Sequence, residues 1–275
     1  MFAKKVEIHG HRGARGLYPE NSIKGFIEAV KLGVDAIEMD VVISRDGKVV
    51  VSHEPWMNPK ICTTPEGLPV KWTTRKNIFK MDYERVKQYD CGKRVHPDFP
   101  QQQPSPQYKP LLSEVIEKIE KFISENKLQK VQYNIEIKSS KLTDNRFHPT
   151  PEKFAKIIFD TISTFKIDNR IMIQSFDKRV LKAIHNLDKN IQIGMLVFNS
   201  WSLNYHLKKL GFTPYAYNPS YKSLKEKNLQ EAHKMGIKLF IWTVNEVSEM
   251  KKVIEMGVDG IITDYPDRAV MIQKK

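Results

Sequence analysis

Two periods alternate in the hydrophobic pattern of this 275-residue chain. Short runs rich in β-branched residues predict strands, and segments with apolar residues three or four positions apart predict helices. The predicted strands are 6–11, 36–43, 133–138, 171–174, 191–197, 215–218, 239–244 and 260–263. The predicted helices are 21–31, 112–125, 152–165, 178–187, 203–210, 224–235, 247–256 and 266–272. Each of the eight strands is thus followed by one helix. This pattern predicts an α/β protein with the TIM (β/α)8 barrel fold.

An open, doubly wound sheet is the alternative architecture for such an alternation. That fold carries a glycine-rich dinucleotide loop after its first strand, and no such loop follows residues 6–11. The barrel is therefore favoured, with residues 1–275 as a single domain of the size that this fold usually has. At the start of the first helix we expect Asn21 to be the N-cap.

One segment after the second strand does not follow the alternation. Arg45-Asp46-Gly47 predicts a turn, and residues 48–53 then return as the second arm of a hairpin. Residues 54–110 hold nine of the fifteen prolines and both cysteines, with little helical pattern. We expect a small inserted subdomain there, lying over the barrel mouth where substrate enters. Its apolar residues are expected to form a small core of its own. They are Trp56, Met57, Ile61, Trp72, Ile78 and Phe79.

The charge balance of the chain is basic. Forty-five Lys and Arg against 32 Asp and Glu give a net charge of +13. Such an excess favours anionic partners, although lysines on helix surfaces with Glu nearby also serve solubility. A non-catalytic nucleic-acid binder is one alternative, but no recognised nucleic-acid motif is present. No run of about 18 apolar residues occurs, so we expect no transmembrane segment.

The cysteines and the first residues bear on the compartment. Two cysteines exclude a disulfide-rich scaffold and a cysteine-rich zinc module. The first residues lack the apolar core and cleavage site of a secretory signal. The sequence as it stands therefore indicates a cytoplasmic protein, or a periplasmic or secreted one if a signal peptide was removed. With no signal visible, we expect Cys62 and Cys91 to be free thiols.

Acidic residues recur on the inner face of two predicted strands. Side chains alternate along a strand, so Glu38 and Asp40 share one face, roughly 6.6 Å apart along it. Glu136 faces inward on the next barrel strand, beside Lys138. Three acids inside a barrel are costly unless a metal or basic residues neutralise them. An all-oxygen set suits Mg²⁺ or Ca²⁺. A buried ion-pair network with Lys138 and Arg12 explains the spacing equally well.

Histidines end two of the predicted strands. His11 follows the first strand and His53 ends the hairpin arm, so both are placed near the three acids. Two histidines near a cation suit general acid and base catalysis on a phosphate ester. Arg12 offers a planar fork for phosphate oxygens, and Lys138 a point charge. A zinc site built on His9 and His11 would need histidines on the fifth and sixth strands, which have none.

Ordered motifs along nearly the whole chain resemble the glycerophosphodiester phosphodiesterase family. They are His11-Arg12-Gly13, Pro19-Glu20-Asn21-Ser22, Glu38-Met39-Asp40-Val41, Asp46-Gly47, Val49-Val50-Val51-Ser52-His53, Asn134-Ile135-Glu136-Ile137-Lys138, Gln174-Ser175-Phe176, Trp242-Thr243-Val244-Asn245 and Gly257-Val258-Asp259-Gly260-Ile261-Ile262-Thr263-Asp264-Tyr265-Pro266. The resemblance implies a TIM barrel with an insertion after the second catalytic histidine. Residues 54–110 occupy that place.

The resemblance also implies a role for each candidate residue. The implied roles are acid and base for His11 and His53, metal ligand for Glu38, Asp40 and Glu136, and substrate binding for Arg12, Lys138 and Trp242. The implied cofactor is one divalent cation, Mg²⁺ or Ca²⁺. Glu54 stands where the family usually has Asp, a change that keeps the charge. His9 is an additional histidine, which we expect to face inward with its hydrogen bonds satisfied rather than to bind metal.

The implied reaction is hydrolysis of a small-molecule glycerophosphodiester to an alcohol and sn-glycerol 3-phosphate. The attacking oxygen is either the neighbouring glycerol hydroxyl, which gives a cyclic phosphate, or water. Within the same fold, the alternative is a phospholipase D-like or sphingomyelinase D-like enzyme acting on lysophospholipid head groups. That alternative requires an apolar rim facing the lipid.

Overall fold

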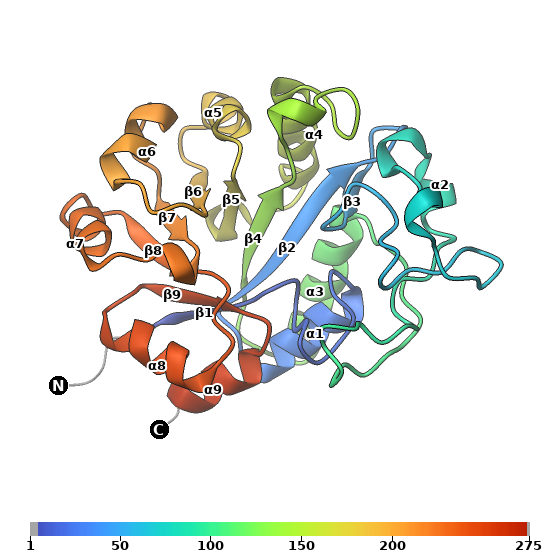
Figure 1. The fold of residues 1–275 in the computed structure, drawn as a ribbon, viewed down its shortest axis with the longest axis horizontal. Coiled ribbons are helices and arrows are strands. Elements are labelled where there is room, and N and C mark those ends of the chain that lie inside the picture. The colour runs from blue at the N-terminus through green and yellow to red at the C-terminus, as the bar shows by residue number, and fades with distance from the viewer. Residues whose placement is uncertain (1–4, 274–275) are drawn as a thin grey trace.

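Eight parallel strands close a barrel in the computed structural model, which describes residues 5–273 (Figure 1). They follow one another around the barrel in chain order, and pairing of the first with the second closes the ring. They are β1 (Glu7–Gly10), β2 (Ala36–Ile43), β4 (Gln132–Ile137), β5 (Ile171–Ser175), β6 (Gln192–Val197), β7 (Ala216–Pro219), β8 (Lys238–Ile241) and β9 (Gly260–Thr263). The predicted TIM barrel is confirmed.

One helix follows each barrel strand, and the helices surround the strands (Figure 1). They are α1 (Ile23–Leu32), α3 (Leu112–Glu125), α4 (Pro151–Ile162), α5 (Lys178–Leu187), α6 (Leu203–Leu210), α7 (Glu226–Lys234), α8 (Val247–Glu255) and α9 (Pro266–Gln273). Each helix buries an apolar stripe, such as Val115, Ile116 and Ile119 of α3, against the outward side chains of the strands. The main core therefore lies between the strands and the helices, and the barrel interior is free for polar side chains near the mouth.

Helix α1 begins two residues later than predicted. Its N-cap is Ser22, whose hydroxyl oxygen accepts a hydrogen bond from the Gly25 N–H. The expectation that Asn21 caps this helix is therefore wrong. Asn21 has a positive φ of 50°, and its side chain turns away from the helix and donates to Asp40 on β2 at 2.8 Å. The residue type typical of a helix cap therefore serves at position 21 to bind a carboxylate of the neighbouring strand.

The insertion begins after β3 (Val49–Val51), which pairs antiparallel with β2. It lies beyond the arrowhead end of β2 in Figure 1 and contains only short helices. They are η1 (Trp72–Thr74), η2 (Ile78–Lys80) and α2 (Tyr83–Val86). A second apolar cluster, separate from the main core, joins this segment to the hairpin through Val42 and Val50. Val42 lies on the face of β2 that also carries Glu38 and Asp40.

Three of the six apolar residues expected in the insertion core are there, and three are not. Met57, Ile61 and Ile78 are buried in the second cluster. Phe79 instead packs against the main core. Trp72 is 57% exposed and Trp56 is half-buried, because both indoles line hollows beside the barrel mouth. For these three residues the expectation is wrong.

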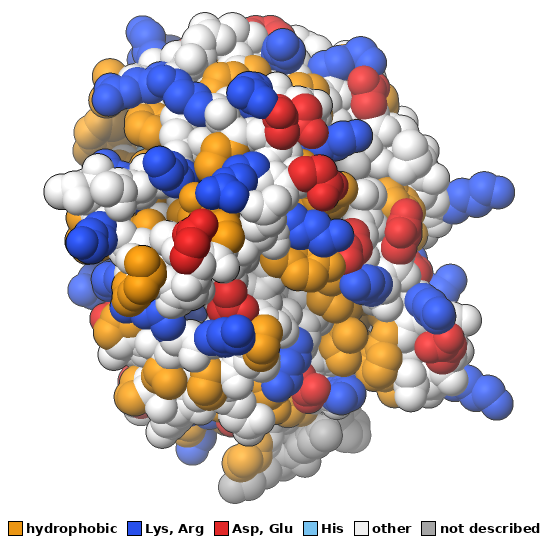
Figure 2. Space-filling view, turned by 90° about the vertical axis from the view of Figure 1, so that its right-hand side faces the viewer, with side chains coloured by type: hydrophobic (Ala, Val, Ile, Leu, Met, Phe, Trp, Pro, Cys, Tyr) orange, Lys and Arg blue, Asp and Glu red, His pale blue; other side chains and the backbone are white. Residues whose placement is uncertain are grey.

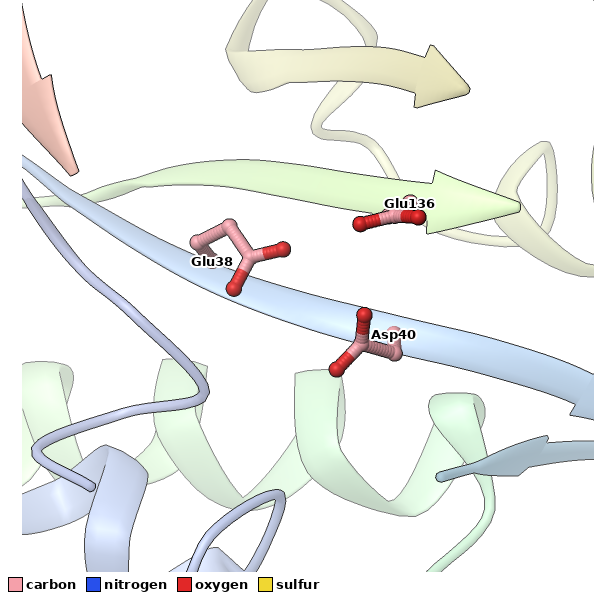
Figure 3. Close-up of side chains that lie close together, drawn as sticks. All are labelled: Glu38, Asp40 and Glu136. Atoms are coloured by element: carbon pink, nitrogen blue, oxygen red, sulfur yellow. The ribbon is translucent and has the colours of Figure 1, made fainter. Parts of the chain in front are cut away.

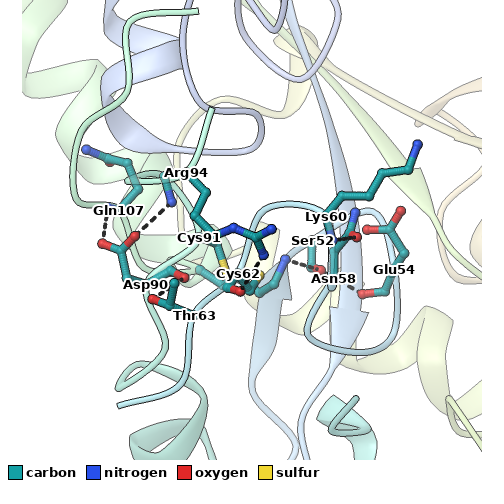
Figure 4. Close-up of a disulfide and its surroundings, with 12 residues drawn as sticks. Ser52, Glu54, Asn58, Lys60, Cys62, Thr63, Asp90, Cys91, Arg94 and Gln107 are labelled. Carbon is teal, nitrogen blue, oxygen red and sulfur yellow. Dashed lines mark hydrogen bonds between the residues drawn. A yellow bond between two sulfur atoms is a disulfide. The ribbon is translucent and has the colours of Figure 1, made fainter. Parts of the chain in front are cut away.

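The two cysteines form a disulfide inside the second cluster (Figure 4). The chain folds back between them, so that the Thr63 N–H donates to the Asp90 carbonyl at 2.7 Å. The neighbouring Cys62 and Cys91 then lie with their Cα atoms 4.0 Å apart. The expectation of two free thiols is therefore wrong. The spacing of 29 residues could not show it, because the intervening chain is irregular.

Replacing Cys62 and Cys91 with Ser should lower the free energy of unfolding by about 2–4 kcal/mol, since the cross-link restricts the unfolded chain. Urea unfolding of the two proteins measures this. Protein prepared without reductant and then unfolded should show no titratable thiol. Two reactive thiols under those conditions would contradict the pairing.

In residues 5–273, no helix combines the length and the apolar character that crossing a membrane requires.

Candidate active site

Three buried carboxylates meet at the barrel mouth (Figure 3). Glu38 and Asp40 both project from the inner face of β2, and the β2–β4 register places Asp40 beside Glu136. These residues are 1%, 0% and 7% exposed. One oxygen from each lies within 4.8 Å of the others. The predicted alternation of side chains therefore holds, and the three acids form one group.

Burial and mutual repulsion shape the ionisation of this group. Burial raises the pKa of Glu38 well above its usual range, and the charges of Asp40 and Glu136 add to the effect. Burial likewise raises the pKa of Glu136, against the opposing charge of Lys138. Asp40 behaves oppositely: burial would raise its pKa, but Lys138 and Arg12 bring it well below the usual range. A bound cation would relieve this repulsion.

The ion pairs of the alternative interpretation are also present. Lys138 Nζ lies 2.7 Å from Glu136 Oε1 and 3.1 Å from Asp40 Oδ1. Arg12 Nε lies 3.3 Å from Asp40 Oδ2, and the Arg12 guanidinium also donates to Glu20 at 3.2 Å. Basic residues thus neutralise part of the acidic group.

The charges around the mouth are compatible with a cation in addition to these ion pairs. Interacting acids and bases crowd the mouth: Glu20, Glu38, Asp40, Glu54, Glu136 and Asp264 against Arg12, Arg15, Lys109 and Lys138. With all of them ionised, the six acids exceed the four bases by two charges, which one divalent cation balances. Asp40 Oδ1 is buried and paired with Lys138 at 3.1 Å, with no further hydrogen bond among residues 5–273. The residues therefore fit a divalent cation with oxygen ligands.

His11 is oriented by a carboxylate from the far end of the chain. Its Nδ1 lies 2.6 Å from Asp264 Oδ1. Arg15 donates two hydrogen bonds to Asp264, at 2.8 and 3.0 Å, and Asn245 donates a third at 2.8 Å. Burial opposes ionisation of Asp264, but His11 and Arg15 keep its pKa well below the usual range.

The proton of neutral His11 is therefore on Nδ1, facing the Asp264 carboxylate. Nε2 faces the acids, 3.9 Å from Glu38 Oε2. Burial lowers the pKa of His11 to about 4, although the Asp264 charge acts in the opposite direction. At neutral pH this ring is uncharged, and Nε2 can accept a proton.

His53 has an equivalent carboxylate partner. Its Nδ1 lies 2.9 Å from Glu54 Oε1, so the glutamate that departs from the family pattern makes the contact with His53. Burial opposes ionisation of Glu54, but its hydrogen bond and its electrostatic interaction with His53 lower the pKa of Glu54 to about 2. The His53 side chain is 31% exposed, against 12% for His11. The second histidine therefore sits nearer to solvent.

A cavity of about 150 Å³ joins these groups, and we call it the inner cavity. Both histidines, Arg12, Lys138 and Trp242 line it. Trp242 donates its indole N–H to the Asn218 carbonyl at 2.8 Å, and its ring lies edge-on to Phe176 at 5.4 Å. The structure thus brings all eight residues predicted for the site to one place at the mouth of the barrel.

Comparison with known proteins connects this geometry to a family. The sequence model of the glycerophosphoryl diester phosphodiesterase family matches residues 11–268. The chain belongs to this family. It is 30% identical to a glycerophosphodiester phosphodiesterase of Caldanaerobacter subterraneus subsp. tengcongensis, over 98% of this chain and 99% of that protein. It is also 28% identical to human lysophospholipase D GDPD1, over 94% of this chain and 83% of that protein.

A solved structure has the same fold. It is an Oleispira antarctica phosphodiesterase in complex with the product sn-glycerol-3-phosphate, with a TM-score of 0.78 and 21% identity over 98% of this chain and 97% of that one. As a member of the family, the protein is an enzyme, a phosphoric diester hydrolase that acts on glycerophosphodiesters. The family depends in general on a divalent metal, which agrees with the acidic group.

Three contacts in this phosphodiesterase were missed from the sequence. Asp264 orients His11, Asn21 holds Asp40, and Gln174 donates to Glu38 Oε1 at 3.2 Å. Asn21, Gln174 and Asp264 all lie in motifs that carry the family resemblance, and this was the one indication in the sequence that they belong to the site. Their partners are 19 to 253 residues away, so no local pattern specifies the pairing.

His9 lies inside the barrel, 1% exposed, away from the lining of the inner cavity. Its ring packs at 4.6 Å from Phe240, and Nδ1 is 3.2 Å from the Asn134 amide nitrogen. The other ring nitrogen, Nε2, faces the Glu7 carboxylate, with Oε2 at 3.5 Å. Both ring nitrogens therefore have a polar partner inside the barrel.

Proposed function

We propose that Glu38, Asp40 and Glu136 hold one divalent cation, Mg²⁺ or Ca²⁺, and that His11 and His53 are the base and the acid of glycerophosphodiester hydrolysis. The products are an alcohol and sn-glycerol 3-phosphate. The observation that carries the proposal is the pair of histidine–carboxylate contacts next to the three inward acids, with both histidines, Glu38 and Glu136 in the wall of the inner cavity. When bound, the cation supplies a Lewis acid for a phosphate oxygen.

The environments of the two histidines support the division of roles. His11 is uncharged at neutral pH and presents Nε2 to the cavity, which suits a base that takes the proton of the attacking hydroxyl or water. His53 borders both the inner cavity and a larger, more open one beside it. A leaving alcohol that extends into the larger cavity would be next to His53, which would donate its proton.

The other lining residues bind the substrate. Arg12 and Lys138 face the cavity as the positive charges nearest to the acids and would bind phosphate oxygens. Trp242 and Phe176 form an apolar wall on which the carbons of the glycerol can rest. The inner cavity would therefore enclose the glycerophosphate half of the substrate.

Release of sn-glycerol 3-phosphate from a panel of water-soluble glycerophosphodiesters tests this proposal. We expect release from at least one diester, loss of activity after exhaustive chelation, and recovery on adding back Mg²⁺ or Ca²⁺. Full activity without metal, or release of a phosphorylated head group in place of sn-glycerol 3-phosphate, would contradict it.

Action on lysophospholipids is a second candidate, because exposed aromatic side chains continue from the inner cavity. Phe198 is 70% exposed and lies 5.9 Å from Phe176, and Trp201, 55% exposed, lies beyond it on the same connection. These residues could hold an acyl chain. Including lysophosphatidylcholine in the panel tests this, and a higher kcat/KM for the lipid than for glycerophosphocholine would favour it.

Nucleic-acid binding has no comparable support. On the face with the insertion, Lys and Arg are interspersed with acidic and hydrophobic side chains and form no continuous stripe (Figure 2). The buried acids at the mouth would also repel a phosphate backbone.

A further inference from the structure

A larger cavity of about 450 Å³ adjoins the inner cavity, and we call it the outer cavity. The two share His53, Glu136, Lys138 and Phe176 in their walls, so the second continues directly from the place of the phosphate. A shallower hollow of about 560 Å³ shares Trp56, Arg75 and Phe147 with the outer cavity. A substituent on phosphorus that leaves the inner cavity on this side therefore enters the outer one.

The wall of the outer cavity joins two segments distant in sequence. The Asn77 side-chain amide of the insertion donates to the Arg146 carbonyl, in the connection after β4, at 2.8 Å. Trp56 packs edge-on against Phe147 of the same connection at 5.5 Å. These contacts hold the insertion and the connection together, so the side chains between them have a defined position.

Two guanidinium groups give this wall its charge. Arg75 lies over the Trp56 ring at 4.9 Å and near Trp72 at 5.9 Å, and Arg146 lies over Phe147 at 5.2 Å. Arg75 donates to the Trp72 carbonyl at 3.0 Å. Among the residues that the structure describes, neither arginine forms an ion pair with a carboxylate.

The only acid among the described residues that line either hollow is Glu136, and its charge is directed to Lys138. Arg146, and Arg75 beyond its bond to the Trp72 carbonyl, therefore keep N–H groups without a carboxylate partner on a wall without a compensating acid. Their stacking on aromatic rings limits their motion while leaving the N–H forks available to a ligand.

We infer that the outer cavity is a subsite for a leaving alcohol that carries a negative charge, a phosphate or carboxylate bound by Arg75 and Arg146. The inference rests on the proposed hydrolysis of glycerophosphodiesters. Guanidinium forks match the oxygens of both anions. A quaternary ammonium group would instead need open aromatic faces, and here guanidinium groups cover the faces of Trp56 and Phe147. The subsite therefore selects against choline.

Four diesters of sn-glycerol 3-phosphate with short alcohols test the inference. The alcohols are choline, ethylene glycol, glycolate and ethylene glycol monophosphate, and sn-glycerol 3-phosphate is measured as the common product. We expect kcat/KM to be about tenfold higher for the diesters of the two anionic alcohols than for the ethylene glycol diester, the size of effect that two partly exposed charge pairs produce. The choline diester should have the lowest kcat/KM of the four. The preference should decrease as salt screens the charges.

The variant that removes both charges is Arg75→Gln with Arg146→Gln. We expect it to bring the ratio of kcat/KM between the anionic and neutral diesters close to one, mainly through KM. Comparing ratios between the two proteins cancels the different intrinsic reactivities of the alcohols. The matched control is Arg85→Gln, an exposed insertion arginine over the Tyr89 ring at 5.8 Å and outside these cavities, which should leave the ratio unchanged.

The outcomes separate this inference from the proposed function. Hydrolysis of the ethylene glycol diester without preference for the anionic alcohols would overturn the subsite and leave the proposed function intact. An equal loss on all four diesters in the double variant would also overturn it, because the arginines would then act on cavity shape. No release of sn-glycerol 3-phosphate from any diester would overturn the proposed function as well.

Discussion

Replacing either His11 or His53 with Ala should lower kcat by about 10²–10⁴-fold, with a smaller effect on KM, if the two share proton transfer as proposed. Each ring is held through Nδ1 by a carboxylate, Asp264 or Glu54, so each presents Nε2 to the cavity. The double variant should lose much less than the product of the single losses, because the two histidines act on one reaction as a unit. Steady-state kinetics on glycerophosphocholine measures all three variants.

A substrate with an acidic leaving group separates the acid from the base. A nitrophenyl ester of glycerophosphate needs little protonation as it leaves, so it should restore most of the activity lost in His53→Ala. It should not restore His11→Ala, which lacks the group that accepts the proton of the attacking oxygen. His9→Ala is the control, since His9 lies apart from the inner cavity. Equal rescue of both variants would contradict the assignment, and rescue of His11→Ala alone would reverse it.

Replacing Glu38 with Gln should remove metal binding and lower kcat/KM by at least about 10³-fold, because one of three ligands and its charge are lost. Without metal, the variant should unfold at nearly the same temperature as the parent. Burial and neighbouring acids already disfavour the charged form of Glu38, so an uncharged amide fits that environment. Isothermal titration with Mg²⁺ and with Ca²⁺, and thermal unfolding with and without each ion, measure both effects.

The parent protein should gain stability on adding the cation, since the ligand binds only the folded state. The Glu38→Gln variant should show no such gain. The matched control is Glu120→Gln. Glu120 is a carboxylate on α3 that lies outside the mouth and pairs with Arg170 at a distance of 2.7 Å. It should bind metal like the parent. Unchanged metal affinity in Glu38→Gln would remove this residue from the proposed ligand set.

Most of the fold could be predicted because its signals are local. Alternating strand and helix patterns over eight units specify a barrel without knowledge of any distant contact. The candidate residues followed from the same rule: parallel strands bring their carboxyl ends to one mouth, and His11, Glu38, Asp40 and Glu136 lie at or near such ends. The errors lie where the chain is irregular: at Cys62, Cys91, Trp56, Trp72 and Phe79 in the insertion, and at Asn21 in the loop before α1.

Strand periodicity and residue type are carried by short segments, so the barrel, the family and the set of acids and histidines at the mouth follow from the sequence alone. Three features became visible only in the folded chain: Asp264 orients His11, Cys62 pairs with Cys91, and Arg75 and Arg146 line one cavity. Each of these contacts joins segments far apart in the chain. Their distances depend on how loops without periodicity fold against the barrel, and no local pattern of hydrophobic and polar residues encodes that.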